Sequence, residues 1–404
     1  MKFSQIGRVT LASVLSLAMI LGMTSCTNAY TIAYLYVTSA KSNPGGVSAF
    51  KIDYDSGALN LIADSPFPSG GRNPVGLVVA PNNSYVYVIN RDDNNVVEFA
   101  IGTDGKLYSQ HTYNTTGSFP TSIAMDASGK FLLVAFTYRP GFTNASPGPG
   151  GINVWPINND GSLGTLVSNG ALSYFPVGVT PVGINVTKFN NFVYVVDQGD
   201  TPQAQVVGYS LNKTSGALTL TPGCSITPTG AFSCFAAGVQ PSAIASEATS
   251  RYVYVTDQAS NQLIGYVVQS TGALVPMLNG PFRTDLFPVG LTVDPRGKFL
   301  YVVNYNAATV NSYAIDGSTG NPAGVAASTS SGVFSGPTCV TIEPSRGLYL
   351  YTSNFLDNSI SGKQLDPHTG ALIDIQNTPF PTSAQPTCSA SAATGDHATQ
   401  AIQP

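Results

Sequence analysis

Short runs of alternating apolar and polar residues recur along the chain, and residues 288–304 show the repeating unit in full. Leu291 and Val293 alternate with small or polar neighbours, which predicts a half-buried strand. Residues 299–303, Phe-Leu-Tyr-Val-Val, have the aromatic and β-branched composition of a buried strand. Between them, Asp-Pro-Arg-Gly at 294–297 predicts a tight turn, because proline presets φ and glycine accepts unusual backbone angles.

This unit occurs seven times, and its two halves are out of phase. The first strands open at Pro74, Pro120, Pro181, Pro241, Pro288, Pro337 and Pro386, and the second strands centre on Tyr36, Tyr87, Leu133, Tyr194, Tyr254, Tyr301 and Tyr351. The first aromatic strand has no proline strand before it, and the last proline strand has no aromatic strand after it. An open row of repeats would leave two unpaired edges, whereas a closed ring pairs them.

Two further strands follow each aromatic strand, as at 95–101 and 106–108, and turns such as Ser-Gly-Ala-Leu at 56–59 recur between them. Each repeat therefore supplies four strands, and its length of about fifty residues suits a propeller blade. The sequence predicts an all-β fold, a seven-bladed β-propeller with four antiparallel strands per blade. It spans residues 34–391 and is closed by pairing of the N- and C-terminal strands.

Composition supports this fold class and excludes one class of partner. Of 404 residues, only 9% are charged and 43% are hydrophobic, while 41 glycines and 28 prolines indicate many turns. The formal net charge is −4, and lysine and arginine are scattered singly. Nucleic-acid binding needs a basic patch, so no nucleic-acid partner is expected.

Residues 1–25 have the features of a targeting segment rather than of the fold. Lys2 and Arg8 give a positive start, and 9–23 is an apolar stretch too short to span a bilayer comfortably. The stretch ends in Met-Thr-Ser-Cys at 23–26, which resembles a bacterial lipoprotein signal.

That resemblance implies cleavage before Cys26 and lipidation of its sulfur, with 26–33 as a lipidated tether. The alternative is ordinary secretion with cleavage after Ala29. Thr27, which is not Asp, points by resemblance to the outer membrane. The chain is thus expected to be exported and lipid-anchored in the cell envelope, on its periplasmic or surface face, with 392–404 as a C-terminal tail.

Four cysteines remain once Cys26 is set aside, an even number that fits an exported protein. Cys224 and Cys234 lie close together in one long segment, where a disulfide is expected. Cys339 and Cys388 occupy the same position of neighbouring proline strands, two residues after the proline. Their pairing stays open between a disulfide and two buried thiols. No histidine stands near any of the four, so no zinc site is expected.

Polar residues at the ends of the aromatic strands form the candidate binding site. Asparagine and aspartate often cap strands and turns, but a polar and aromatic rim also suits a sugar or a peptide. The long loop at 137–151 adds a second feature of this rim, either as a binding loop or as a tolerated insertion. The candidate rim residues are Asn90, Arg91, Arg139, Asp197, Gln198, Asp257, Gln258, Asn304, Tyr305, Asn354 and Phe355.

Other ionisable residues are better explained by structure than by chemistry. A set of acids recurs six residues after the prolines, where each begins a turn and is expected to accept backbone hydrogen bonds: Asp126, Glu247, Asp294 and Glu343. The three histidines, His111, His368 and His397, lie in an outer strand or its loop, a blade-edge turn and the C-terminal tail. None is placed to face the channel, and no cofactor or metal is expected.

The Pro-x-x-Ile and Tyr-Val-Tyr-Val-x-Asn repeat resembles the YVTN and lactonase families of seven-bladed propellers, across nearly all of residues 34–391. In the lactonase enzymes, including 6-phosphogluconolactonases, one proline strand carries an Arg-His pair directly after the proline, facing the channel. Here the corresponding pairs are Val75-Gly76, Thr121-Ser122, Val182-Gly183, Ser242-Ala243, Val289-Gly290, Thr338-Cys339 and Thr387-Cys388.

Lactone hydrolysis needs a base for water and a donor or cation for the oxyanion, and these positions supply no arginine or histidine. The leading hypothesis is therefore a non-catalytic binding or scaffold module of the cell envelope, with a protein or carbohydrate ligand. One alternative is a lactone hydrolase that uses other rim residues. The other is a subunit of an extracellular assembly.

Overall fold

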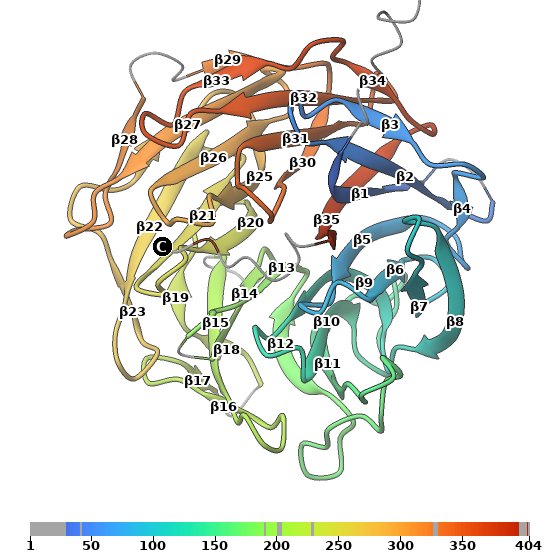
Figure 1. Cartoon of the computed structure of the whole chain (residues 1–404). Helices are drawn as coiled ribbons and strands as arrows, with labels where there is room; N and C mark the ends of the chain where they lie inside the picture. Colours follow the sequence, from blue (N-terminus) through green and yellow to red (C-terminus); the bar gives the residue numbers. More distant parts are fainter. Residues whose placement is uncertain are drawn as a thin grey trace, which may run out of the picture.

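The computed structural model describes residues 30–404, apart from 41–42, 190, 200–203, 228–229, 326–329, 396–401 and 403–404. Seven antiparallel sheets form the blades of the propeller. They are arranged in a ring about a central axis (Figure 1). The part of the chain so described consists of strands and turns without an α-helix, and it offers no helix that could cross a membrane. The predicted all-β, seven-bladed propeller is confirmed.

Each blade has four strands, and we number the blades 1 to 7 by their innermost strand. The innermost strands are β5 (Pro74–Val79), β9 (Ser118–Met125), β13 (Pro181–Val186), β20 (Pro241–Ser246), β25 (Pro288–Val293), β30 (Pro337–Ile342) and β35 (Pro386–Ala393). The second strands are β6 (Tyr85–Asn90), β10 (Phe131–Tyr138), β14 (Phe192–Asp197), β21 (Tyr252–Asp257), β26 (Phe299–Asn304), β31 (Tyr349–Asn354) and β1 (Thr31–Ser39).

The outer half of each blade follows the same order. The third strands are β7 (Asn95–Ile101), β11 (Pro149–Pro156), β15 (Gln205–Leu211), β22 (Gln262–Val268), β27 (Thr309–Ile315), β32 (Ser359–Leu365) and β2 (Gly46–Asp53). The outermost strands are β8 (Leu107–Asn114), β12 (Phe175–Val179), β16 (Leu218–Leu220), β23 (Leu274–Pro276), β28 (Pro322–Gly324), β33 (Leu372–Asp374) and β3 (Leu59–Leu61).

Short additional strands decorate the ring without adding to the count of four per blade. Five of them pair with a third strand: β4 (Phe67–Pro68), β19 (Phe235–Ala236), β24 (Phe282–Arg283), β29 (Ser330–Gly332) and β34 (Phe380–Pro381). A separate hairpin of β17 (Ser225–Ile226) and β18 (Phe232–Ser233) lies in the long segment of blade 3. The hydrophobic cores lie between adjacent blades, as where β10 and β11 pack against β13 to β15.

Closure of the ring joins the two ends of the chain in blade 7. Strand β35 pairs antiparallel with β1, with Leu35 opposite Ser391 and Val37 opposite Ser389. The N-terminal part of the chain supplies the three outer strands of this blade, and the C-terminal part supplies the innermost one. The predicted pairing of the terminal strands is therefore confirmed.

The tyrosine at the centre of the second strand fastens each blade to the next one. In six blades its buried hydroxyl donates to the carbonyl of a glycine in the turn between the third and fourth strands of the following blade. The pairs are Tyr36 with Gly105, Tyr87 with Gly161, Tyr194 with Gly272, Tyr254 with Gly320, Tyr301 with Gly370 and Tyr351 with Gly57. Leu133 takes the place of the tyrosine in blade 2 and leaves a gap in this tyrosine ring.

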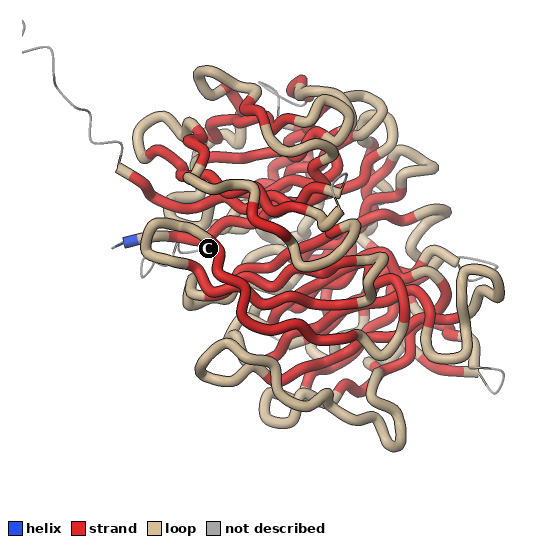
Figure 2. Tube along the Cα trace, turned by 90° about the vertical axis from the view of Figure 1, so that its right-hand side faces the viewer, coloured by secondary structure: helices blue, strands red, loops and turns tan. Residues whose placement is uncertain are grey.

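The channel has two different openings, because every innermost strand runs in the same direction along it. We call the end at the prolines the proline mouth and the end at the turn between the first two strands the turn mouth. Figure 2 shows the strands running between these two faces. Both described ends of the chain lie at the turn face: Tyr30 accepts a hydrogen bond from the Tyr54 amide, beside Arg346, and Ile402 lies against Pro295 and Pro344.

Candidate functional site

The seven innermost strands line a cavity of about 220 Å³ in the channel. Its wall consists of the residues that follow the seven prolines, including both positions where the family enzymes carry an arginine and a histidine. No aspartate, glutamate, histidine, lysine or arginine is among these described lining residues. The cavity is also smaller than most ligand pockets, which span about 300–1,000 Å³. This wall therefore lacks an acid–base group for hydrolysis.

The hydroxyl groups of this wall are used to hold neighbouring blades together. Thr121, Ser242 and Thr387 each donate, at 2.7 Å, to the carbonyl of the proline that opens the next blade. Thr338 donates to the Thr387 carbonyl at 2.8 Å. Valine stands at this position in the other three blades. Because these protons are already engaged, the hydroxyls act as clasps between the blades rather than as free donors toward a substrate.

Both cysteine pairs form disulfides, and one of them belongs to the channel wall. Cys339 of β30 is bonded to Cys388 of β35, so a covalent link joins blade 6 to the strand that closes the ring. Cys224 is bonded to Cys234 across the β17–β18 hairpin. The option of two buried thiols at Cys339 and Cys388 is thus not the one that the structure adopts.

The asparagine and aspartate set at the ends of the second strands is buried, which corrects the expectation that it lines a binding rim. Asn90, Asp197, Asp257, Asn304 and Asn354 are each 0% exposed. Asn90 and Asp257 bond to the loop that enters the innermost strand of their own blade, where backbone groups lie outside the sheet. Asn304 and Asn354 bond to the third strand of their own blade.

Two of these residues illustrate the pattern. Asp257 accepts the amides of Val239 and Gln240, and although burial alone would raise its pKa, these two amides hold the pKa of the carboxyl below its usual value. Asn354 donates to the hydroxyls of Ser359 and Ser361. Asp257 thus fixes the loop before β20, whereas Asn354 links β31 to β32.

The residues that directly follow this buried set form the actual proline mouth. Their backbone amides donate to the residue before each proline, as from Arg91 to Asn73 and from Tyr305 to Phe287. Their side chains are half-buried or exposed around the opening. The members in five blades are Arg91, Gln198, Gln258, Tyr305 and Phe355. The structure thus brings together five of the predicted rim residues as one ring.

Contacts differ among these mouth residues. The Arg91 guanidinium lies 5.2 Å from the Phe119 ring centroid, and Tyr305 packs edge-on against Phe287 at 6.3 Å. The Gln198 amide donates to the Pro241 carbonyl and so acts as another clasp between blades. Arg139 lies in the loop of blade 2, where its guanidinium is 5.4 Å from the Phe142 ring centroid.

The backbone before the prolines adopts an unusual conformation that the sequence did not reveal. Asn73, Phe119, Thr180, Phe287 and Gln385 all have positive φ, between 53° and 62°. Such angles are uncommon for residues other than glycine and are rare for bulky or β-branched ones. They turn the chain sharply into the innermost strand. The one sequence signal is Gly336, a glycine at the same position before Pro337.

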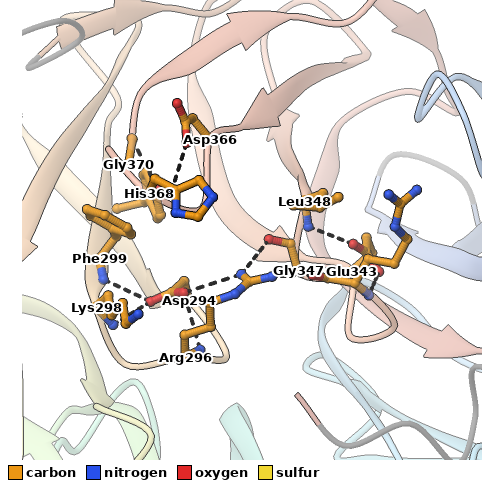
Figure 3. Close-up of polar contacts among 12 residues, drawn as sticks. Asp294, Arg296, Lys298, Phe299, Glu343, Gly347, Leu348, Asp366, His368 and Gly370 are labelled. Atoms are coloured by element: carbon orange, nitrogen blue, oxygen red, sulfur yellow. Dashed lines mark hydrogen bonds and ion pairs between the residues drawn. The ribbon is translucent and has the colours of Figure 1, made fainter. Parts of the chain in front are cut away.

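The recurring acids begin turns, and their oxygens are occupied by backbone amides. Asp294 accepts the amides of Lys298 and Phe299, and Glu343 accepts the amide of Leu348, as Figure 3 shows. Burial raises the pKa of Glu343, although its amide donors oppose this shift. These carboxyl groups stabilise the turns, and although Asp126, Glu247 and Asp294 border cavities on the turn face, their oxygens are engaged by their own turns.

The described histidines lie away from the channel. His111 is on the outermost strand β8, with Nδ1 3.1 Å from the buried Glu98 carboxylate. His368 donates its backbone amide to Asp366 in a turn at the blade edge. His397 and Cys26 fall outside the described residues. Across the described positions, no group of three His, Cys, Asp or Glu residues could hold a metal ion.

The fold and the repeat define the class of protein as a closed, seven-bladed propeller of the lactonase type. The pattern of the family "Lactonase, 7-bladed beta-propeller" matches residues 67–139 and 186–342, which is more than half of the chain. The chain belongs to this family.

Individual relatives agree with this membership. The chain is 24% identical over 365 residues to a 6-phosphogluconolactonase of Bacillus subtilis, a match that covers 85% of this chain and 95% of the relative. It is 26% identical over 280 residues to a 6-phosphogluconolactonase of Pectobacterium carotovorum, which covers 61% of this chain and 81% of the relative.

Solved structures share the fold at low identity. A crystal structure from Bacteroides fragilis has a TM-score of 0.71 at 21% identity and covers 91% of this chain and 99% of its own. The periplasmic gluconolactonase of Pseudomonas aeruginosa has a TM-score of 0.69 at 18% identity and covers 90% of this chain and 100% of its own.

Proposed function

We propose that this chain is a non-hydrolytic binding protein whose proline mouth takes a carbohydrate. The observation that carries the proposal is the channel wall, in which both positions after every proline lack an ionisable side chain. Around the opening, Tyr305 and Phe355 offer aromatic faces, and Gln258 and Arg91 offer amide and guanidinium donors. Aromatic faces combined with a few polar groups suit a sugar ring and its hydroxyls.

The proposed location follows from the sequence before the propeller. Cleavage before Cys26 and lipidation of its sulfur would anchor the protein in the cell envelope, with the outer membrane as the proposed site. Metabolic labelling with a palmitate analogue tests this part: the wild type should incorporate the label and Cys26→Ala should not. Labelling that is equal in both proteins, or absent from both, would reject the anchor.

The binding function is tested by a glycan screen followed by titration of the best ligand. Tyr305→Ala should weaken binding at least tenfold, because it removes an aromatic face of the mouth. The matched control is Tyr108→Ala, since Tyr108 is 52% exposed on the outermost strand of blade 1, away from the channel. Equal affinity in the two variants would contradict carbohydrate binding at the mouth.

A second candidate is lactone hydrolysis, and family membership together with the names of the relatives favours it. We expect no turnover of glucono-δ-lactone or 6-phosphogluconolactone above the rate in buffer. Turnover that Arg91→Ala or Tyr305→Ala abolishes, while the folded state is retained, would replace the binding function with hydrolysis by rim residues.

A further inference from the structure

A second polar cavity lies on the turn face, at the seam between blades 2 and 3. It has a volume of about 320 Å³ and is lined by three lysines, Lys130, Lys188 and Lys213, together with Asp126, Ser128, Asn191 and Ala127. Lys130 comes from the first turn of blade 2 and Lys188 from the first turn of blade 3. Lys213 comes from the outer turn of blade 3. The topology of the two blades thus brings these three lysines to one cavity.

None of the three lysines forms an ion pair within the described part of the chain. The ion pairs found there engage other cations, and none includes Lys130, Lys188 or Lys213. Such a cluster is notable in a chain with only 17 lysines and arginines in 404 residues. Like charges gathered around one cavity disfavour each other unless an anion joins them.

Asp126 is the only acid in the wall, and it is already committed to its own turn. One carboxylate oxygen accepts the amides of Lys130 and Phe131, and the other accepts the amide and the hydroxyl of Ser128. The carboxyl is therefore aimed at the backbone and not at the ammonium groups. Asn191 and Ser128 add polar groups to the wall.

An apolar surface continues from this cavity. Phe189 is 53% exposed, and its ring lies 5.5 Å from the Lys188 ammonium. Lys188 also borders the neighbouring cavity of the turn mouth, whose wall combines Val186, Pro295 and Pro344 with the acids Glu247 and Asp294. Both acids accept backbone amides of their own turns. A ligand with an anionic end and a short carbon skeleton fits this combination of charge and apolar contact.

We propose that this cavity binds a phosphate monoester of a small polyol, with the phosphate among the three ammonium groups and the carbon skeleton beside Phe189. A phosphate monoester carries between one and two negative charges at neutral pH and offers several strong acceptors. Lysine binds such groups as a point charge. The site is separate from the proline mouth, because it lies at the opposite ends of the innermost strands.

The experiment measures binding of glycerol 3-phosphate to the full chain by isothermal titration calorimetry at low ionic strength. We expect saturable binding that weakens steeply as salt is added, because the attraction is screened. Lys188→Gln should weaken binding about five- to tenfold, and Lys130→Gln should act similarly. Glycerol without the phosphate should not bind.

The structure offers a matched control for the variants. Lys298 occupies the same position of the same turn in blade 5 as Lys130 does in blade 2, but it does not line the lysine cavity. Lys298→Gln should leave the affinity unchanged. Equal losses in Lys130→Gln and Lys298→Gln would overturn the site, as would the absence of saturable binding in the folded wild type.

Two further binding experiments distinguish a soluble phosphate ester from a lipid headgroup. If the protein binds vesicles that contain phosphatidylglycerol but does not measurably bind free glycerol 3-phosphate, the ligand is a lipid headgroup and the proposal of a soluble polyol phosphate is wrong. Binding of free glycerol 3-phosphate that such vesicles do not outcompete supports the soluble ligand. The Lys188→Gln variant must weaken the interaction in whichever experiment is positive, or the cavity is not the site.

Discussion

Removal of a single hydroxyl from the six tyrosines that link neighbouring blades should measurably lower the free energy of unfolding. In Tyr194→Phe, the Gly272 carbonyl loses a donor that lies 2.8 Å away. Tyr194 is 0% exposed, so water does not replace the lost hydroxyl. The loss of one partner from a buried hydrogen bond costs about 1–3 kcal/mol. The packing of the aromatic side chain is retained, because phenylalanine has the same phenyl group without the hydroxyl.

Urea denaturation followed by circular dichroism measures this loss. Tyr108→Phe is the control, because its side chain is 52% exposed and its change should stay within about 0.5 kcal/mol. Tyr301→Phe lies in another blade, so the losses of unfolding free energy in Tyr301→Phe and Tyr194→Phe should add in the double variant. If Tyr194→Phe changes the free energy of unfolding no more than Tyr108→Phe does, the blade-linking tyrosines stabilise the fold by packing and not by hydrogen bonding.

Three further predictions concern the same framework. Burial raises the pKa of Tyr36, Tyr194 and Tyr301, so their stabilisation is complete below about pH 10 and is lost as the pH rises toward the folded-state pKa, at about 1.4 kcal/mol per pH unit for each tyrosine. The part of the 295 nm absorbance change that these buried tyrosines contribute should therefore appear only on unfolding, and a change already complete for all 20 tyrosines near pH 10 with intact circular dichroism would contradict this. The double variant Cys339→Ala/Cys388→Ala removes a link between residues 49 apart and should cost up to about 4 kcal/mol, against about 3 kcal/mol for the pair 10 residues apart, Cys224→Ala/Cys234→Ala. An equal or smaller loss for the longer link, measured by thermal unfolding, would count against the chain-entropy explanation. Asp294→Ala should lower the unfolding free energy by about 1–3 kcal/mol more than Asp316→Ala, because Asp294 is 1% exposed whereas Asp316 bonds its turn at the surface; comparable losses in urea denaturation would show that burial of the acid adds nothing.

The sequence was sufficient for the architecture, because each strand carries its own signal. Alternation with a period of two and the turn residues mark every hairpin locally. The phase difference between the proline strands and the aromatic strands then requires closure through Pro386 and Tyr36. None of this depends on contacts between distant residues.

The candidate site was harder to predict, because burial depends on neighbouring segments. Asn90 and Asn304 have the composition of a polar rim, yet both are buried, Asn90 beside the loop that enters its own blade and Asn304 beside β27. The hydrogen bond between Tyr194 and Gly272 could not be predicted for the same reason, because these residues are 78 positions apart. The lysine cavity could not be predicted either, since its members come from two blades and show no periodicity along the chain.

The position of Tyr30 at the turn face sets the orientation of a tethered molecule. Tyr30 lies four positions after Cys26, and an extended chain over four residue steps reaches at most about 14 Å. A lipid on Cys26 would therefore hold the turn face close to the bilayer, with Ile402 on the same side. The proline mouth would then be directed away from the lipid and accessible to diffusing ligands.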